Sequence, residues 1–348
     1  MTADVTADVT APMNHRLLLR THLDGRSTEG VFTVDRAEVP TVTPGTFLVR
    51  NEWLSLDPAM RTWSSATPGR GTPLALGSVM RAYAVGFVTD SAHPDYSAGD
   101  CVVGPFGLQE WHLSDGVDVR MRPSPVPTQL SVTLGSVGHI GLSALIGLTE
   151  IARIRPGDTV LVSSAAGAVG SQAGQIARIL GCRTIGIAGG PEKAALCRDL
   201  YGFDAAIDYR ASSDLSADIA LAAPEGIDVF FDNVGGRTLD AVVPLMNEYG
   251  RIAICGTISL DSKRPGTGPR WERQILDRQL SVQGFLQSHF QGDVDALLAR
   301  LHNWSDDGLL VLREDVTIGV ASAPAAIERL LNGNNLGKAL IRIDRTTE

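Results

Sequence analysis

Small residues between Ala165 and Gly174 have the types and spacing of a phosphate-binding turn. The apolar run at 160–162 predicts a buried strand before them, and the residues that follow predict a helix beginning inside the turn. A dinucleotide pyrophosphate needs this layout, because its oxygens approach a bare backbone and the free N–H groups of a helix start. Gly167 permits that approach, and Gly170 lets the helix pack closely on the strand. The predicted contacts are Ala166, Gly167, Ala168, Val169 and Gly170.

The motif itself departs from the usual G-x-G-x-x-G pattern. Ala165 stands where the first glycine is expected, so the motif is only moderately specific. A glycine-rich turn of an ordinary α/β protein is the alternative.

The next predicted strand, 183–188, indicates which dinucleotide binds. In NAD-binding units a carboxylate at the end of this strand accepts hydrogen bonds from the adenosine ribose hydroxyls. Here the strand runs into Gly189 and Gly190, with no acid at its tip to repel a ribose 2′-phosphate. Lys193 follows at the start of the next helix and is placed to pair with that phosphate. Glu192 beside it argues against this pairing, and a solvated lysine is the alternative, but the combination favours NADPH over NADH.

The composition indicates a globular protein and excludes some classes of partner. The chain has 348 residues, 44% of them hydrophobic and 20% charged, and a net charge of −9. This charge argues against nucleic acid as a partner, since proteins that bind it present a basic surface. No apolar run is long enough to cross a membrane. Four isolated cysteines without zinc spacing suggest reduced thiols and a cytoplasmic location. Residues 1–12 are expected to form a disordered tail without a secretory signal.

The distribution of residue types along the chain predicts two units. Short alternating segments with Gly and Pro punctuation between about 16 and 122 indicate a β-rich unit. Strands and helices then alternate, which predicts an α/β doubly wound parallel sheet. A last helix and strand return the chain to the first unit. We therefore expect a β-rich domain over 13–125 and 296–348, and a Rossmann dinucleotide-binding domain over 126–295.

Hydrophobic periodicity predicts the individual elements. Predicted strands cover 32–34, 46–51, 81–88, 160–163, 183–188, 205–208, 227–232, 250–255 and 339–343, and a turn leads into another strand within 96–104. Predicted helices cover 170–180, 191–200, 238–246, 294–307 and 323–332, and helices broken at Gly135, Gly138 and Gly141 cover 134–153.

Several segments, in one order across nearly the whole chain, resemble the zinc-independent medium-chain dehydrogenases/reductases. Within this family they are most similar to the group of prostaglandin reductase, leukotriene B4 12-hydroxydehydrogenase and curcumin reductase. Their combination is far more specific than any single segment. The matching segments are 54–61 (LSLDPAMR), 135–138 (GSVG), 165–174, 231–236 (FDNVGG), 250–256 (GRIAICG), 283–285 (QGF) and 335–338 (NLGK).

The resemblance implies a GroES-like catalytic domain around a Rossmann domain, usually in a homodimer. It implies NADPH-dependent reduction of the carbon–carbon double bond of a small hydrophobic enone or enal, by hydride transfer to the β-carbon. By the same analogy, Lys193 and Tyr209 hold the 2′-phosphate. The other implied cofactor contacts are Gly189, Asn233, Cys255, Gly256, Thr257, Phe285 and Asn335. From the residues alone, Asn233 also suits a turn, Tyr209 a surface aromatic and Asn335 a helix C-cap.

Two tyrosines that are common in the family are missing here. Ala59 takes the tyrosine position of D-P-Y-M-R, and Ile258-Ser259 is followed by Leu260 rather than by the usual donor to the substrate carbonyl. Reduction of an enone builds charge on that oxygen, so a donor is needed there. Tyr83 is the candidate donor, with an ordinary strand aromatic as the alternative. The predicted substrate pocket contains Asp57, Ala59, Met60, Asp261 and Phe285.

Three other functions compete with this interpretation. A quinone reductase and an enoyl-thioester reductase belong to the same superfamily, and the D-P-x-M-R and N-L-G-K matches argue against both. A non-catalytic NADPH-binding protein is the alternative from another class, and the missing tyrosines keep it open. Cys101, His93 and His112 lack the arrangement of zinc ligands, which argues against zinc-dependent alcohol oxidation.

Overall fold

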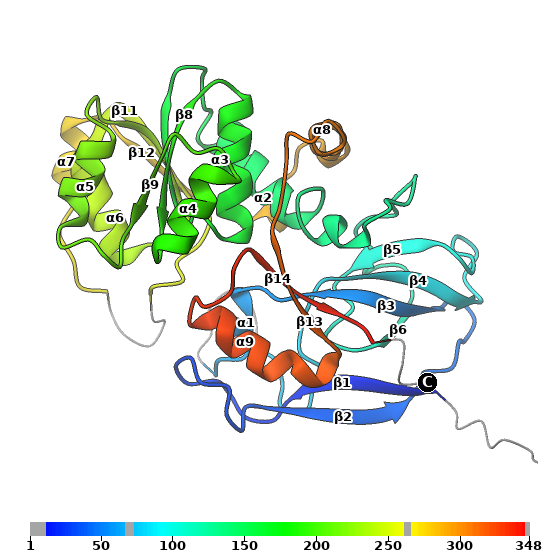
Figure 1. The fold of residues 1–348 in the computed structure, drawn as a ribbon. Coiled ribbons are helices and arrows are strands. Elements are labelled where there is room, and N and C mark those ends of the chain that lie inside the picture. The colour runs from blue at the N-terminus through cyan, green and yellow to red at the C-terminus, as the bar shows by residue number, and fades with distance from the viewer. Residues whose placement is uncertain (1–11, 67–72, 261–265, 345–348) are drawn as a thin grey trace, which may run out of the picture.

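The computed structural model describes residues 12–66, 73–260 and 266–344. Its two units lie side by side (Figure 1), one around a parallel sheet and the other built from the first strands together with the C-terminal elements. The chain therefore leaves the β-rich unit, forms the parallel-sheet unit and returns. This confirms the predicted fold class. The domain boundaries stay a prediction, and residues 1–11 of the predicted tail lie outside the described residues.

The parallel sheet has its strands in the order β12-β11-β10-β7-β8-β9. Chain order reverses between β7 and β10, which makes the sheet doubly wound and places a ligand crevice at the carboxyl ends of these two strands. The strands are β7 (Thr159–Ser163), β8 (Arg183–Ala188), β9 (Ala205–Asp208), β10 (Ile227–Asp232), β11 (Met246–Ile254) and β12 (Ser281–Gly284).

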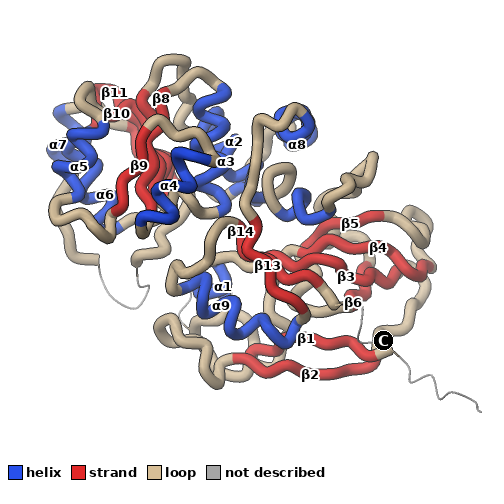
Figure 2. The backbone as a smooth tube through the Cα atoms, viewed as in Figure 1, coloured by secondary structure: helices blue, strands red, loops and turns tan. Residues whose placement is uncertain are grey.

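Helices cover both faces of this sheet (Figure 2). Val160 and Val162 pack in one apolar cluster and Leu161 in another, because successive side chains of a strand point to opposite faces. The helices are α2 (His139–Ile146), α3 (Ala168–Ile179), α4 (Pro191–Asp199) and α8 (Val294–Asp306) against the first cluster, and α5 (Leu215–Ala222), α6 (Gly236–Val242) and α7 (Glu272–Asp277) on the second side. None of the helices within the described ranges has the length and apolar character needed to span a bilayer.

The β-rich unit is a sheet in the order β13-β14-β3-β4-β5, with β6 also paired to β3, and a separate β1-β2 hairpin. Strand β14 comes from the end of the chain and pairs antiparallel with β3, with Ile341 opposite Leu54. The core of this unit also receives Ile327 from α9 (Ala323–Leu331). The strands are β1 (Met13–Leu19), β2 (Phe32–Glu38), β3 (Phe47–Ser55), β4 (Ala84–Ser91), β5 (Cys101–Gly104), β6 (Trp111–Ser114), β13 (Glu314–Ile318) and β14 (Lys338–Arg342), and α1 (Ala59–Trp63) follows β3.

Two of the predicted helices differ from the structure. The helix expected over 238–246 ends at Val242, and Met246 already belongs to β11, because Pro244 in the following 3₁₀ turn cannot donate a backbone hydrogen bond. Helix α2 runs through Gly141 without a break. A Cβ atom on Gly141 would lie 1.9 Å from the Ser136 carbonyl oxygen, so this glycine serves close packing.

Replacing Gly170 with alanine tests the close contact of α3 with the turn after β7. The added Cβ atom would lie 2.2 Å from the Ser164 carbonyl oxygen, so backbone must move. We expect Gly170→Ala to lower the free energy of unfolding by about 2 kcal/mol or more, measured by urea denaturation. Gly266→Ala, which meets open space, is the control. Equal stability of the two variants would contradict this packing.

Candidate functional site

The carboxyl ends of β7 and β10 are joined by hydrogen bonds at the point where strand order reverses. Ser163 Oγ donates to Asp232 Oδ1 (2.8 Å), and Asn233 donates from its backbone N–H to Ser163 Oγ (2.8 Å) and from Nδ2 to the Ser163 carbonyl oxygen (2.7 Å). Burial raises the pKa of Asp232, against the opposing effect of the N–H groups of Gly235 and Val234. These bonds fix the predicted contact Asn233 at the crevice.

The five residues predicted for the pyrophosphate form the turn after β7 and the first turn of α3. Gly167 is the N-cap of α3 and has an extended backbone. The first N–H groups of a helix have no partner inside it, so they point out of the helix start with partial positive charge. Ser164 adopts the left-handed backbone region, with φ of 53°, and its carbonyl oxygen lies under Gly170. The turn therefore has the shape and polarity that a pyrophosphate requires.

The residues predicted for the 2′-phosphate come together at the tips of β8 and β9. A Cβ atom on Gly189 would lie 2.8 Å from the ring of Tyr209, so the ring rests against the glycine. Lys193 Nζ donates to the carbonyl oxygen of Gly333 (2.9 Å), beyond α9. Burial, together with the nearby charge of Arg210, lowers the pKa of Lys193. A phosphate beside these cations would relieve their repulsion, so the site fits an anionic group.

Sequence reasoning missed two charged residues at this site. Asp208 Oδ1 accepts hydrogen bonds from the backbone N–H groups of Gly190 (2.6 Å) and Arg210 (3.0 Å), so a carboxylate does reach the tip of β8, from the neighbouring strand. Arg210 adds a second cation next to Lys193. Their signal was the triplet Asp208-Tyr209-Arg210 at the end of a predicted strand.

The segment after β11 lies against the end of β10. The N–H groups of Cys255 and Gly256 both donate to the carbonyl oxygen of Asp232 (2.8 and 3.1 Å). A Cβ atom on Gly256 would lie 2.8 Å from the Asn233 carbonyl oxygen, and the Thr257 side chain lies beside Gly235. The structure thus brings three more predicted cofactor contacts to the crevice.

Phe285 borders a hollow of about 560 Å³ with a mixed lining, to which Gln283, His289 and Gln291 contribute polar groups. Its ring meets Phe231 edge to face, with ring centroids 6.2 Å apart. The other apolar side chains of the lining are Ile146, Ile151, Ile254, Leu286 and Phe290. The apolar side chains beside Phe285 offer contact surface to an apolar group.

Asn335 is buried, and its Nδ2 donates to the Gly337 carbonyl oxygen (2.7 Å). This bond closes the turn between α9 and β14. The side-chain nitrogen is thus used locally, but the C-cap of α9 is Asn332, so Asn335 is not the helix C-cap of the alternative interpretation.

The two positions that lack the family tyrosines lie near each other at the boundary of the units. Arg61 Nη1 donates to the carbonyl oxygen of Ile258 (3.0 Å), which connects α1 to the segment after β11. Ala59 is exposed, whereas Met60 has no exposed surface and packs in the core of the β-rich unit, so it offers no surface to a substrate. Asp261 lies outside the described residues.

The ring of Tyr83 stacks on His139, with centroids 4.5 Å apart and an interplanar angle of 15°. Burial raises the pKa of Tyr83, the Asp57 charge adds to this, and the interaction with Arg120 opposes it. His139 was not predicted as a site residue, because an isolated histidine near a glycine-rich segment carries no motif.

A buried ion pair lies beneath these rings. Lys338 is 1% exposed, and its Nζ donates to Asp57 Oδ1 (2.8 Å), Ser55 Oγ (2.6 Å) and the Leu56 carbonyl oxygen (2.9 Å). Burial alone would raise the pKa of Asp57, but Lys338 and His139 outweigh it and hold this pKa well below its usual range. Asp57 is therefore an anion whose charge is matched inside the protein.

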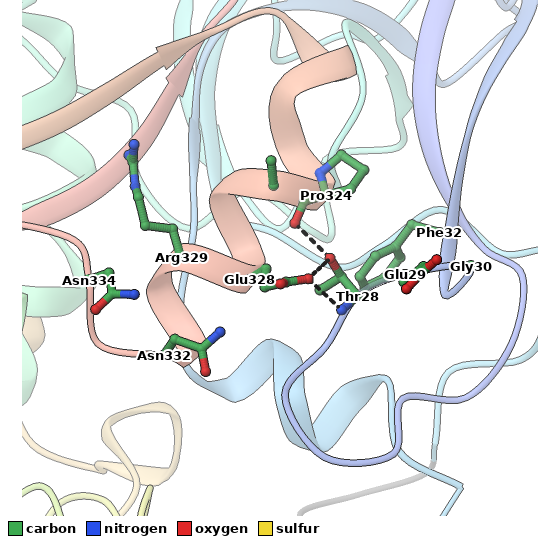
Figure 3. A pocket seen from close by; sticks show the side chains of 10 residues that line it. Thr28, Glu29, Gly30, Phe32, Pro324, Glu328, Arg329, Asn332 and Asn334 are labelled. Carbon is green, nitrogen blue, oxygen red and sulfur yellow. Dashed lines mark hydrogen bonds between the residues drawn. The ribbon is translucent and has the colours of Figure 1, made fainter.

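A second hollow, of about 530 Å³, lies between α9 and the segment before β2 (Figure 3). Thr28 closes one side by donating from its N–H and Oγ1 to Glu328 Oε2 (2.9 and 3.0 Å). None of the predicted site residues lines it.

Comparison with known proteins agrees with this arrangement. Residues 15–121 match the family described as the N-terminal domain of oxidoreductase, and residues 168–303 match the family described as zinc-binding dehydrogenase. The chain is 35% identical to the NADPH-dependent curcumin reductase of Escherichia coli over 336 residues, which cover 95% of this chain and 97% of the relative. It is 37% identical to prostaglandin reductase 1 of Rattus norvegicus over 331 residues, 93% and 97% of the two chains.

A solved structure shows the same fold. The crystal structure of CurA in complex with NADPH from Vibrio vulnificus has a TM-score of 0.89 and 34% identity, and the match covers 95% of this chain and 99% of that one. Fold and crevice define a dinucleotide-dependent oxidoreductase. The chain belongs to the medium-chain dehydrogenase/reductase family, in the group that includes the curcumin and prostaglandin reductases. The predicted family is confirmed.

Replacing Lys193 with alanine tests the phosphate site. We expect Lys193→Ala to weaken NADPH binding by about tenfold to 100-fold, the equivalent of a charge-assisted contact of roughly 1.5–3 kcal/mol. The affinity for NADH, which lacks the 2′-phosphate, should change little. Fluorescence titration of both cofactors measures the difference, with Arg198→Ala in the last turn of the same helix as control. Equal losses for the two cofactors would contradict the assignment.

Replacing Lys338 with methionine tests the buried pair. Asp57 would then be a buried charge without its cation, so we expect a loss of about 3–5 kcal/mol in the free energy of unfolding. The double variant with Asp57→Asn and Lys338→Met should lose less of its free energy of unfolding. Since the folded-state pKa of Asp57 is lowered, its contribution to stability is present above the unfolded value of about 3.9 and disappears as the pH falls below it. Urea denaturation at neutral pH and at about pH 3 measures both effects.

Proposed function

We propose that this protein is an NADPH-dependent reductase of the carbon–carbon double bond of α,β-unsaturated ketones and aldehydes, and that it works without zinc. The observation that carries the proposal is the match with curcumin and prostaglandin reductases along more than nine-tenths of the chain. The site supports it independently. The crevice offers a pyrophosphate turn and a cationic 2′-phosphate site, and NADPH is the cofactor with both groups.

The residues that hold NADPH follow from the geometry of the crevice. The turn at 166–170 takes the pyrophosphate, and Lys193 with Tyr209 and Arg210 takes the 2′-phosphate. Asn233, Gly256 and Phe285 border the nicotinamide end. NADPH supplies a hydride when bound. The protein orients the substrate, limits access of water and supplies a donor for the carbonyl oxygen, where charge develops.

Zinc independence is supported by the side chains around Asp57. Its carboxylate is already neutralised by Lys338 Nζ. Among the residues that the structure describes, no three His, Cys, Asp or Glu side chains gather as metal ligands do. In this proposal, hydrogen-bond donors polarise the substrate carbonyl.

A small apolar substrate, a homodimer and a cytoplasmic location complete the proposal. The hollow beside Phe285 suits an apolar molecule of modest size. All four residues of β12 are exposed at the edge of the parallel sheet, and an open edge is a template for pairing with a second copy. None of the four cysteines is paired in a disulfide, which suits a reducing compartment.

The decisive experiment follows NADPH oxidation with a panel of enones, enals, quinones and enoyl thioesters, with NADH in parallel. We expect turnover of enones and enals, with NADPH preferred because of the cationic site at Lys193. Turnover of quinones alone would move the protein to the neighbouring quinone reductases. Tight NADPH binding without any turnover would favour a non-catalytic role.

A further inference from the structure

One buried side chain between the two units has polar atoms that the fold itself does not use. Within the described ranges, neither Nδ1 nor Nε2 of His139 has a hydrogen-bond partner, and both atoms are shielded from water. An unpaired buried polar group lowers stability, and native proteins keep such groups where a ligand or a reaction needs them. The missing partner is therefore expected to arrive with the substrate.

His139 lies where the two units meet. It begins α2, which packs on α3 in the parallel-sheet unit, whereas Asp57 and Tyr83 belong to the β-rich unit. Nε2 lies 3.6 Å from Asp57 Oδ1, within ion-pair range although too long for a hydrogen bond. The flat stack with Tyr83 fixes the plane of the ring. Nε2 is thus the nitrogen that faces Asp57, and Nδ1 is the nitrogen that remains available to a ligand.

The charges around the ring keep this orientation fixed. Asp57 is held from its other sides by Lys338 and by Ser55 Oγ, which donates to Oδ2 (2.6 Å), so the carboxylate cannot turn away from His139. The cation of Lys338 balances part of the carboxylate charge. The hydroxyl of Tyr83 interacts with Arg120, so Tyr83 contributes its ring face here.

We propose that His139 is a catalytic residue that donates a hydrogen bond and then a proton from Nδ1 to the carbonyl oxygen of the substrate, with Asp57 orienting the ring through Nε2. This inference rests on the proposed enone reduction. It places the carbonyl donor on a different wall from the missing tyrosines at Ala59 and after Ser259. In the protonated ring, Nε2–H faces Asp57 and Nδ1–H faces the substrate.

Each bond that forms in this step is matched by a bond that breaks. The hydride supplied by NADPH forms the new bond at the β-carbon, the electron pair of the double bond moves toward the carbonyl oxygen, and the Nδ1–H bond breaks as the O–H bond forms. The enol product becomes the saturated ketone in water. Once the product has left, water that enters in its place returns a proton to Nδ1.

Two replacements separate the donor from the packing of the ring. His139→Phe keeps an aromatic ring against Tyr83 without a donor, and His139→Asn places an amide N–H near the position of Nδ1. We expect kcat for 4-phenylbut-3-en-2-one to fall about 100-fold in His139→Phe and distinctly less in His139→Asn, as for loss of one oxyanion donor. NADPH affinity by fluorescence should stay within about twofold. His302→Phe on α8 is the matched control, and thermal unfolding checks that each variant is folded.

A measurement without cofactor completes the test. In protein with ¹⁵N-labelled histidine, 4-phenylbut-3-en-2-one should shift the Nδ1 resonance of His139, which is assigned by its loss in His139→Phe. An unmoved resonance, a wild-type kcat in His139→Phe, or equal losses in both variants would overturn the role of His139 and leave enone reduction intact. Failure of the wild-type protein to reduce any enone would overturn the proposed function and this inference with it.

Discussion

The buried ammonium group of Lys338 constrains more of this structure than any other single group. A lysine with almost no exposed surface must have its charge matched and its three N–H bonds accepted, and Asp57, Ser55 and the Leu56 carbonyl oxygen do this. These acceptors lie at the end of β3 and directly after it, whereas Lys338 begins β14 near the end of the chain. The pair therefore fixes the register in which β14 returns to β3. The ion pair matters more for selecting this register than for the free energy of unfolding, since a buried ion pair and an apolar pair of the same size contribute similar free energies.

The same return of the chain helps to build the cofactor site. The turn before β14 contains Gly333, whose carbonyl oxygen accepts a hydrogen bond from Lys193 of the other unit. Arg61 makes a second polar contact across the boundary, to Ile258, and His139 faces Asp57 at a third. The boundary between the units is thus polar at a few places. These are the places where the predicted phosphate, nicotinamide and substrate residues gather.

Local sequence patterns were enough for most of the parallel-sheet unit. A strand that is buried on both faces has a continuous apolar sequence. A glycine that contacts backbone, such as Gly170, is recognised from its position in the turn motif. The contacts that sequence did not predict all depend on tertiary structure. Asp208 lies on a neighbouring strand, 18 residues beyond Gly190, and its carboxylate accepts a hydrogen bond from the Gly190 N–H at the tip of β8. The partner of Lys193 is 140 residues away. No spacing rule relates such positions, and only the folded sheet brings them together.

Under the proposed enone reduction, a donor other than the two family tyrosines must serve the substrate carbonyl. The hydrogen bond from Arg61 to Ile258 connects the segments that contain the two positions, and neither position carries a tyrosine hydroxyl group here. The need for a donor remains, because charge still develops on the carbonyl oxygen. His139, on a different element, has Nε2 facing the Asp57 carboxylate, Nδ1 without a hydrogen-bond partner, and an aromatic ring that fixes its plane. Transition-state stabilisation requires a donor near one oxygen atom, and it does not matter from which element that donor comes.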